Sequence, residues 1–287
     1  MSFSYDIKTK LSQIMPDCEF CKTAELCGII DFASAVKDGK ISLATENKAA
    51  AERIERLFGE CLGFVPQKKS FSGGCRFEIT NENELDILSL SSDDDEYSKM
   101  PFDCCKKSYI RGAFIGGGSI SDPKKNYHLE FDTKNSFAAD ELLGLLEKEG
   151  IAAKKTARKS HFIIYIKGYE EIAAVLGLMG AGSASMEIYN VSIEKEIRNA
   201  VNRRMNCENA NIDKVVKAYG RHMLAIEKIN NTIGFENLPE SLREIARVRM
   251  EYPDESLKEL GQKLENPIGK SGVNHRLNRL LEIADKL

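Results

Sequence analysis

The sequence has no hydrophobic run long enough to cross a membrane, no secretory signal and little net charge. The longest apolar stretch, residues 172–184, has thirteen residues including three glycines, whereas a membrane-spanning helix needs roughly 20 apolar residues. Residues 1–8 carry neither the basic segment nor the apolar segment of a secretory signal. We therefore expect a cytoplasmic protein with no membrane partner.

The composition is that of an ordinary globular protein and by itself points to no class of ligand. The 287 residues are 42% hydrophobic and 30% charged, which excludes a disordered, collagen-like or membrane-embedded chain. This length suits two domains or one large domain. Because the net charge is only −3, the distribution of the charges is more informative than their sum.

The charges are sorted along the chain. Residues 81–96 contain seven acidic side chains and no Lys or Arg, and the rest of the chain carries a net charge of +4. The acidic stretch predicts a solvated linker. Basic residues gather in three other segments, namely Lys154, Lys155, Arg158 and Lys159; Arg203 and Arg204 with Arg198; and Lys270, Arg276 and Arg279. Such clusters favour contact with the phosphates of a polyanion, although any one of them could be a solvated face without a ligand.

The eight cysteines are expected to be free thiols, because a cytoplasmic chain of this size needs no disulfides. Cys18 and Cys21 have the spacing of half a zinc site, but no second CxxC or HxxxH pair follows. Cys27 could serve as a third ligand, although it falls where a helix should bury a small residue. We therefore predict no metal and no cofactor.

Two segments within the first 185 residues follow the same order of expected elements. In each, a helix is followed by a hairpin, a second helix, two further strands and a closing helix. The corresponding positions are Gly28 with Gly112 and the helix caps Asn47 with Asn135; the first hairpin turns at Asp38-Gly39, and the first closing helix spans 84–90. The chain is therefore expected to be an α+β protein with two pseudo-symmetric αββαββα units, whose twofold shape suits duplex DNA.

The first helix of each unit carries a resemblance to a known family. Leu26–Ser34 and Ile110–Gly118 resemble the paired LAGLIDADG helices of homing endonucleases. In that family, small residues allow close helix contact and a carboxylate at the helix end holds a catalytic divalent metal. Here the carboxylate positions are occupied by Ala33 and Gly117, which cannot ligate Mg²⁺, and Asp31 lies two positions away. The resemblance implies a DNA-binding shape and argues against nuclease chemistry and an enzyme.

From about residue 190 the expected elements are all helical. Apolar spacing predicts one helix around 193–201 and a longer one over 212–229 that ends at Gly234, and Pro239 begins a third. These helices form a C-terminal domain of a different class from the two units before it.

The last 32 residues have the spacing of a helix-turn-helix. Ser256 and Glu259 predict a capping box, and Ser271 is expected to cap the second helix. On the outer face of that helix we expect a DNA-binding set of Lys270, Ser271, Asn274, His275, Arg276, Asn278 and Arg279. Arg and Asn make bidentate contacts with guanine and adenine, and the helix start suits phosphates. An amphipathic helical hairpin without a ligand is the alternative.

Two degenerate LAGLIDADG-like units followed by a helix-turn-helix resemble the bacterial WhiA family. The segments that carry this resemblance are Tyr109–Ile120, Tyr127–Glu130, Asn202–Asn211, Leu238–Leu242 and Lys270–Leu277. The resemblance implies a DNA-binding regulator of the sporulation type, tied to cell division and chromosome segregation, located with the nucleoid and without nuclease activity. Its partners would be double-stranded DNA and division or transcription proteins. Two alternatives stay open, an active homing endonuclease and a scaffold of the division machinery.

These observations together give the expected domain organisation. We expect a lead-in at 1–22, a first LAGLIDADG-like unit at 23–92, an acidic linker at 93–101, a second unit at 102–185, a connector helix at 186–207 and a helical domain at 208–287 with the helix-turn-helix at 256–285. The predicted basic contacts with the DNA backbone lie in the second unit, at Lys154, Lys155, Arg158 and Lys159, and after it, at Arg203 and Arg204.

Overall fold

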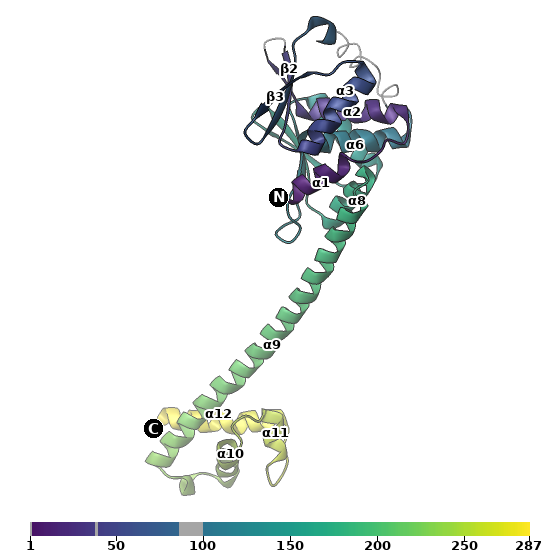
Figure 1. Ribbon diagram of the computed structural model, residues 1–287. Coiled ribbons are helices and arrows are strands. Elements are labelled where there is room, and N and C mark those ends of the chain that lie inside the picture. The colour runs from purple at the N-terminus through teal and green to yellow at the C-terminus, as the bar shows by residue number, and fades with distance from the viewer. Residues whose placement is uncertain (1, 38–39, 86–99) are drawn as a thin grey trace. The chain divides into compact units, whose positions relative to one another are not determined.

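Figure 1 shows the computed structural model, which describes residues 2–37, 40–85 and 100–287. The chain divides into two compact units. The first unit, Met1–Lys195, holds both of the expected αββαββα repeats, and the second unit is Glu196–Leu287. The first unit contains α1 (Phe3–Leu11), α2 (Glu19–Ala33), β1 (Ser34–Lys37), β2 (Lys40–Thr45), α3 (Lys48–Leu62), β3 (Gln67–Phe71), β4 (Gly74–Ile79), α6 (Asp103–Gly117), β5 (Gly118–Ile120), β6 (Leu129–Thr133), α7 (Ser136–Lys148), β7 (Lys154–Arg158), β8 (His161–Ile166) and α8 (Tyr169–Met179). Helix α9 (Gly182–Thr232) continues into the second unit, followed by η1 (Phe235–Asn237), α10 (Glu240–Glu251), α11 (Leu257–Gln262) and α12 (Lys270–Lys286).

The first unit contains two four-stranded antiparallel sheets of the same topology. Their strand orders are β1-β2-β4-β3 and β5-β6-β8-β7. The expected mixed fold with repeated order of elements is confirmed, and α8 closes the second repeat as predicted. The predicted turn at Asp38-Gly39, most of the first closing helix at 84–90 and most of the acidic linker at 93–101 lie outside the described residues.

Helices α2 and α6 pack against each other through their glycines. A Cβ atom on Gly28 would lie 2.3 Å from the carbonyl oxygen of Tyr109, and one on Gly112 would lie 2.0 Å from the carbonyl oxygen of Glu25. Only a residue without a side chain allows two helix backbones to come so close. The predicted role of the two corresponding glycines in close helix contact is therefore confirmed.

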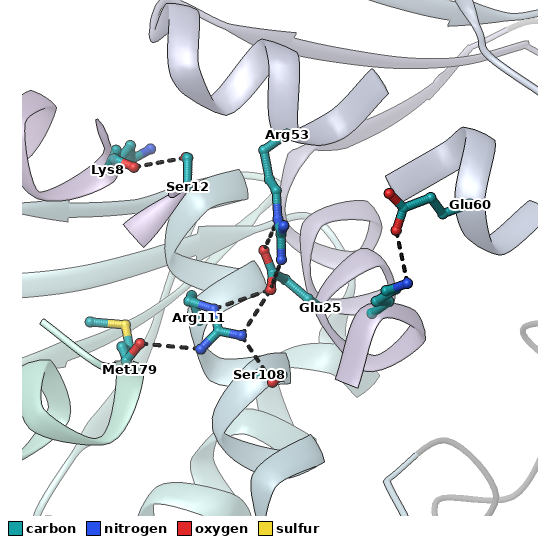
Figure 2. Close-up of polar contacts among 9 residues, drawn as sticks. Lys8, Ser12, Glu25, Arg53, Glu60, Ser108, Arg111 and Met179 are labelled. Atoms are coloured by element: carbon teal, nitrogen blue, oxygen red, sulfur yellow. Dashed lines mark hydrogen bonds and ion pairs between the residues drawn. The ribbon is translucent and has the colours of Figure 1, made fainter. Parts of the chain in front are cut away.

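A buried network of ion pairs lies beside this helix contact (Figure 2). The Glu25 carboxylate, which is fully buried, accepts two hydrogen bonds of 2.8 Å from the Arg53 guanidinium and two, of 3.1 and 2.9 Å, from that of Arg111. Arg111 also donates to the Ser108 hydroxyl and to the carbonyl oxygen of Met179. One carboxylate thus joins helices α2, α3 and α6, and Arg111 reaches the end of α8.

The N-terminal residues, expected only as a lead-in, form helix α1, which belongs to the core of the first unit. Ile7 and Leu11 are buried. The side chain of Asn47 donates to the carbonyl oxygen of Tyr5 at 2.9 Å and accepts from the amide of Ala50 at 3.0 Å. The predicted cap at Asn47 is confirmed, and the same side chain fastens α1 to α3.

Helix α9 is one unbroken helix where we expected two. The expected connector helix at 186–207 is therefore part of a longer element. The expectation came from the polar stretch around 202–211, which interrupts the apolar spacing. Residues 183–219 contain neither Gly nor Pro, so nothing in the backbone stops the helix from continuing. Several apolar side chains along it are exposed, namely Ile193, Ile197, Val201, Ile212 and Val216.

The second unit has its own hydrophobic core, which α10, α11, α12 and the end of α9 share. Gly234 adopts a positive φ of 79°, so α9 cannot continue through it. Pro239 is the N-cap residue of α10, which begins there as predicted. From α12, the buried side chains of Val273, Leu277, Leu280 and Ala284 belong to this core. None of the helices in the described residues is long and apolar enough to span a membrane.

Candidate DNA interface

The turn between α11 and α12 is compact because a glycine lies under it. A Cβ atom on Gly261 would lie 2.2 Å from the carbonyl oxygen of Ile268 and 3.0 Å from a methyl group of Val273. At the start of α11, the Ser256 hydroxyl accepts from the amide of Glu259, whose carboxylate accepts from the amide of Ser256. The predicted capping box is confirmed, and it fixes where α11 begins.

Helix α12 has the predicted inward stripe. Val273, Leu277, Leu280 and Ala284 are all buried. The helix begins at Lys270 with Gly269 as its N-cap, so the expectation that Ser271 caps it is wrong. Ser271 lies inside the first turn. The N-cap residue Gly269 has no side chain that could accept a hydrogen bond from the first backbone amides of α12. The amides and the helix dipole at this end therefore favour an anion from outside the helix.

The seven predicted DNA-binding residues of α12 do not all face the same way. At about 100° per residue, Ser271, His275 and Arg279 form a row opposite the buried stripe, and all three are exposed. Arg279 pairs with Glu282 at the surface, at 2.7 Å. Arg276 lies on one flank, where its half-buried guanidinium contacts Glu244 of α10 at 3.3 Å. Arg276 must leave this partner before it can reach a base.

Lys270, Asn274 and Asn278 form the other flank of α12 and line a cavity of about 290 Å³. Residues of α9 line its opposite wall, among them Lys214 and Arg221. These two basic residues were not predicted, because they lie far from α12 in sequence and only the fold brings them to it. The result is a groove beside the exposed row of α12 whose lining includes four cationic side chains, those of Lys214, Arg221, Arg249 and Lys270, and the carboxylate of Glu255.

His222 also lines this groove but adds no positive charge near neutral pH. Burial, and then the neighbouring guanidinium of Arg249, lower the pKa of His222 to about 4. Arg249 itself is almost fully buried, lies over the ring of Tyr219 and donates to the carbonyl oxygen of Glu255 at 2.9 Å. The cationic character of the groove therefore comes from Lys214, Lys270 and Arg221, with the buried guanidinium of Arg249 behind them.

The basic cluster on β7 is divided by the alternation of the strand. Lys154 and Arg158 lie opposite Tyr165 and His161, on the face of the sheet that the helices leave open, and both are exposed. Lys155 lies on the other face, where it donates to Asp140 at 2.6 Å. Lys159 follows in the turn, at a positive φ of 56°. Of the four basic residues in this cluster, Lys154 and Arg158 thus share one open face.

The first sheet has a matching group of basic residues that the sequence analysis missed. Lys69 of β3 lies opposite Arg76 of β4, and both are exposed, as is Lys40 of β2. Glu78 lies on the same face, where the Lys69 ammonium lowers its pKa. The alternation of strand β4, with Arg76 between the buried Cys75 and Phe77, was the signal that could have identified this face.

The ends of α2 and α6, where a nuclease would hold its metal, surround a small cavity of about 230 Å³. Ala33 and Gly117, the positions expected to lack the metal-binding carboxylates, both line it. The lining contains one carboxylate, that of Asp132, which contacts Nδ1 of His161 at 2.6 Å. Asp31 lies elsewhere, with its carboxylate 2.9 Å from the Tyr109 hydroxyl. A single carboxylate from a sheet is a poor substitute for the paired helix-end carboxylates of a two-metal site.

The two remaining predicted phosphate contacts, Arg203 and Arg204, lie in the middle of α9. Both are exposed. Arg204 pairs with Glu208 one turn later, at 3.0 Å. Exposed pairs of this kind exchange easily with solvent, so both guanidinium groups are accessible to a ligand.

Cys18 and Cys21, which have the spacing of half a zinc site, lie next to a second pair of cysteines in the folded chain. The sulfur atoms of Cys18 and Cys21 lie beside those of Cys104 and Cys105, and all four are within 4.8 Å of one another. Cys27 is not part of this group. The sequence did not predict the second pair, because Cys104 and Cys105 are adjacent residues of another helix and do not have the CxxC spacing.

Replacing Gly261 by Ala should destabilise the second unit by about 1–3 kcal/mol, the usual cost of forcing an extra group into a packed core. The added Cβ meets a backbone oxygen that cannot rotate away. Urea denaturation of the full chain, followed by circular dichroism, measures the loss. Gly220→Ala in α9 is the matched control, because a Cβ there has nothing within 4 Å. Equal stability of the two variants would contradict the tight turn.

Known protein families match segments in both units of the chain. Residues 106–198 match the WhiA LAGLIDADG-like domain, and residues 201–284 match the WhiA C-terminal HTH domain. The chain is 40% identical over 312 residues to the probable cell division protein WhiA of Thermoanaerobacter pseudethanolicus and 41% identical over 307 residues to that of Ruminiclostridium cellulolyticum. In both alignments the whole chain covers 98% of the relative.

The structural comparison extends over the full length of the chain. A crystal structure of full-length DUF199/WhiA from Thermotoga maritima matches with a TM-score of 0.62 at 25% sequence identity, covering 100% of this chain and 99% of that one. A second crystal structure, of the N-terminal LAGLIDADG domain of DUF199/WhiA, matches 62% of this chain with a TM-score of 0.53. The chain belongs to the WhiA family.

Proposed function

We propose that this protein is a sequence-specific DNA-binding regulator whose recognition helix is α12. The observation that carries the proposal is the outer face of α12, which exposes Ser271, His275 and Arg279 with Asn274 and Asn278 beside them. Recognition helices of helix-turn-helix proteins lie in the major groove and contact base edges with their first turns. Asn and Arg are the side chains best suited to read adenine and guanine there.

The cations around this helix suit the DNA backbone. Lys270 stands at the start of α12, and Lys214 and Arg221 face it across the groove. Phosphate contacts of this kind orient a protein on the duplex without reading its sequence. The open faces of the two sheets, with Arg76 on one and Lys154 on the other, suit a second, sequence-independent contact with the backbone. Arg203 and Arg204 would add to it.

The names of the relatives support a role in cell division. The relatives are called probable cell division proteins, so we propose that the chain regulates genes of cell division and chromosome segregation and that it is associated with the nucleoid. A scaffold role, in which the LAGLIDADG-like unit holds a division protein, is the second candidate. It is favoured by the acidic residues Glu78, Glu130 and Asp132 among the cations of the open sheet faces.

We also propose that the protein does not cleave DNA, because Ala33 and Gly117 replace the metal-binding carboxylates. Supercoiled plasmid incubated with the full chain and Mg²⁺ should remain supercoiled while a gel shift shows that it is bound. Asp132→Asn separates the alternatives, since Asp132 is the carboxylate that lines this cavity. Nicking by the wild-type chain that Asp132→Asn abolishes would establish a nuclease and refute this part of the proposal.

Replacing Lys270 by Ala should weaken binding to every duplex by a similar factor. A lysine that neutralises one phosphate contributes about 0.9 to the slope of log affinity against log salt concentration, so the slope should fall by about 1. Fluorescence anisotropy with a labelled duplex across a salt series measures it. Lys286→Ala, at the far end of the same helix, is the matched control and should leave the slope unchanged. An unchanged slope for Lys270→Ala would remove this residue from the interface.

A further inference from the structure

Four cysteines at the starts of two helices lie next to one another in the first unit. Cys18 is the N-cap residue of α2 and Cys21 lies in its first turn, while Cys104 and Cys105 lie in the first turn of α6. The Cys18 sulfur lies 3.4 Å from that of Cys21 and 3.9 Å from those of Cys104 and Cys105. Cys21 and Cys105 are buried, and the other two are partly exposed.

The spacing of these sulfur atoms is that of ligands around a single metal ion. Zinc–thiolate bonds of about 2.3 Å in a tetrahedron place the sulfur atoms about 3.8 Å apart. All four sulfur atoms here lie within 4.8 Å of one another, and the three distances given above bracket the tetrahedral value. A cluster of several irons would hold its outer thiolates farther apart, because the metal and sulfide atoms lie between them. The geometry therefore fits one ion.

The surroundings compensate for the charge that four thiolates bring. Four thiolates and one Zn²⁺ leave two negative charges. The four cysteines lie at the N-terminal ends of α2 and α6, where the positive ends of the two helix dipoles favour negative charge. The Ser108 hydroxyl hydrogen-bonds to Cys21 and accepts from the buried guanidinium of Arg111, which extends this compensation inward.

We propose that Cys18, Cys21, Cys104 and Cys105 bind a structural zinc ion. The tetrahedral four-sulfur donor set selects zinc among the common divalent ions of the cell, and the absence of an open ligand position argues for a structural rather than a catalytic ion. The ion fastens the start of α2 to the start of α6, one helix from each repeat. It thereby holds together the two helices whose glycines come into contact farther along.

Cobalt substitution of the full wild-type chain tests the proposal without any mutation. Protein freed of metal under reducing conditions should bind one Co²⁺ per chain and show the strong visible absorption of tetrahedral cobalt with thiolate charge-transfer bands. Stoichiometric Zn²⁺ should then remove this absorption, since a four-sulfur site prefers zinc. Zinc analysis and native mass spectrometry of the protein as purified should give one zinc per chain.

Matched cysteine variants locate the ion. Cys18→Ser combined with Cys104→Ser should abolish zinc and cobalt binding, whereas Cys27→Ser and Cys75→Ser should retain it, because these cysteines lie outside the group. Ser108→Ala should weaken zinc affinity by about 10-fold, the usual effect of losing a hydrogen bond to a metal ligand. Far-UV circular dichroism must first show that each variant is folded.

Three results would overturn the proposal. The first is a folded, fully reduced wild-type chain that contains no zinc and gives no cobalt absorption. The second is a protein purified without metal whose mass and peptide map show a Cys18–Cys21 disulfide, which would make the group a redox pair. The third is loss of zinc from Cys27→Ser alone, which would contradict the assigned ligands. None of these results depends on whether the chain binds DNA.

Discussion

Glu25→Ala should lower the free energy of unfolding by about 3–5 kcal/mol, the cost of leaving a buried charge without its partner. The substitution removes the carboxylate that Arg53 and Arg111 share in Figure 2 and leaves their two guanidinium groups buried beside each other. Their side chains are 2% and 7% exposed, so water cannot replace the lost partner. Chemical denaturation of the full chain measures the loss. Circular dichroism monitors it, because the chain contains no tryptophan for fluorescence.

The neighbouring pair of Glu60 and Lys22 provides the control. It joins the same two helices, α2 and α3, at 3.0 Å, but the Glu60 side chain is 42% exposed. Glu60→Ala should therefore change the stability by no more than about 1 kcal/mol. A second test replaces all three charges at once, by Glu25→Leu, Arg53→Met and Arg111→Met, and should recover most of the loss. Equal losses for Glu25→Ala and Glu60→Ala would contradict the buried network.

Asn274→Ala combined with Arg279→Ala should weaken binding to the preferred duplex by about 2–6 kcal/mol, at about 1–3 kcal/mol for each bidentate base contact. Both side chains are exposed on α12, and Arg279 leaves only a surface partner when it turns to a base. Binding to a scrambled duplex should fall much less, because it depends on phosphates. Anisotropy titrations of both duplexes at one salt concentration measure the specificity ratio.

Arg276→Ala is the informative comparison for this double variant. Its guanidinium is tied to Glu244 of α10, so its removal should mainly affect how α12 sits on α10 and should reduce affinity for both duplexes together. A selective loss on the preferred duplex would instead show that Arg276 leaves Glu244 and reads a base. No change in the specificity ratio for Asn274→Ala with Arg279→Ala would remove both residues from base recognition.

The sequence was sufficient where the structure depends on local patterns. The capping box of Ser256 and Glu259, the buried stripe of α12 and the cap at Asn47 follow from spacing within one helix, and the structure confirms each of them. The resemblance of the two glycine-bearing helices to paired LAGLIDADG helices implied the contact between α2 and α6, which Gly28 and Gly112 make.

The features that the sequence did not reveal are brought together from separate elements. Glu25 needs cations from two other helices, and Cys18 meets Cys104 only because α2 and α6 pack side by side. The groove beside α12 takes its far wall from α9, as Lys214 shows. Arg276 was expected to contact DNA like its neighbours on α12. Its ion pair with Glu244 could not be foreseen, because it depends on where α10 lies. Such contacts depend on tertiary packing, which periodicity cannot supply.

The basic cluster around β7 does not form a single surface, because strand alternation separates Lys154 and Arg158 from Lys155. This separation follows from the sequence pattern alone. The same alternation in β4 would have identified Arg76 on the open face of the first sheet. The residues proposed for phosphate contact on the sheets are therefore Lys154 and Arg158 with Arg76 and Lys69.

Selection from a random-sequence duplex library tests the central claim most directly. The wild-type chain and the Asn274→Ala, Arg279→Ala double variant are each used to enrich bound DNA at the same salt concentration, and the recovered sequences are compared. We expect the wild type to enrich one short motif and the double variant to bind salt-sensitively with no motif or a relaxed one. Enrichment of the same motif by both proteins, or no salt-sensitive duplex binding by the wild type, would contradict α12 as the recognition helix.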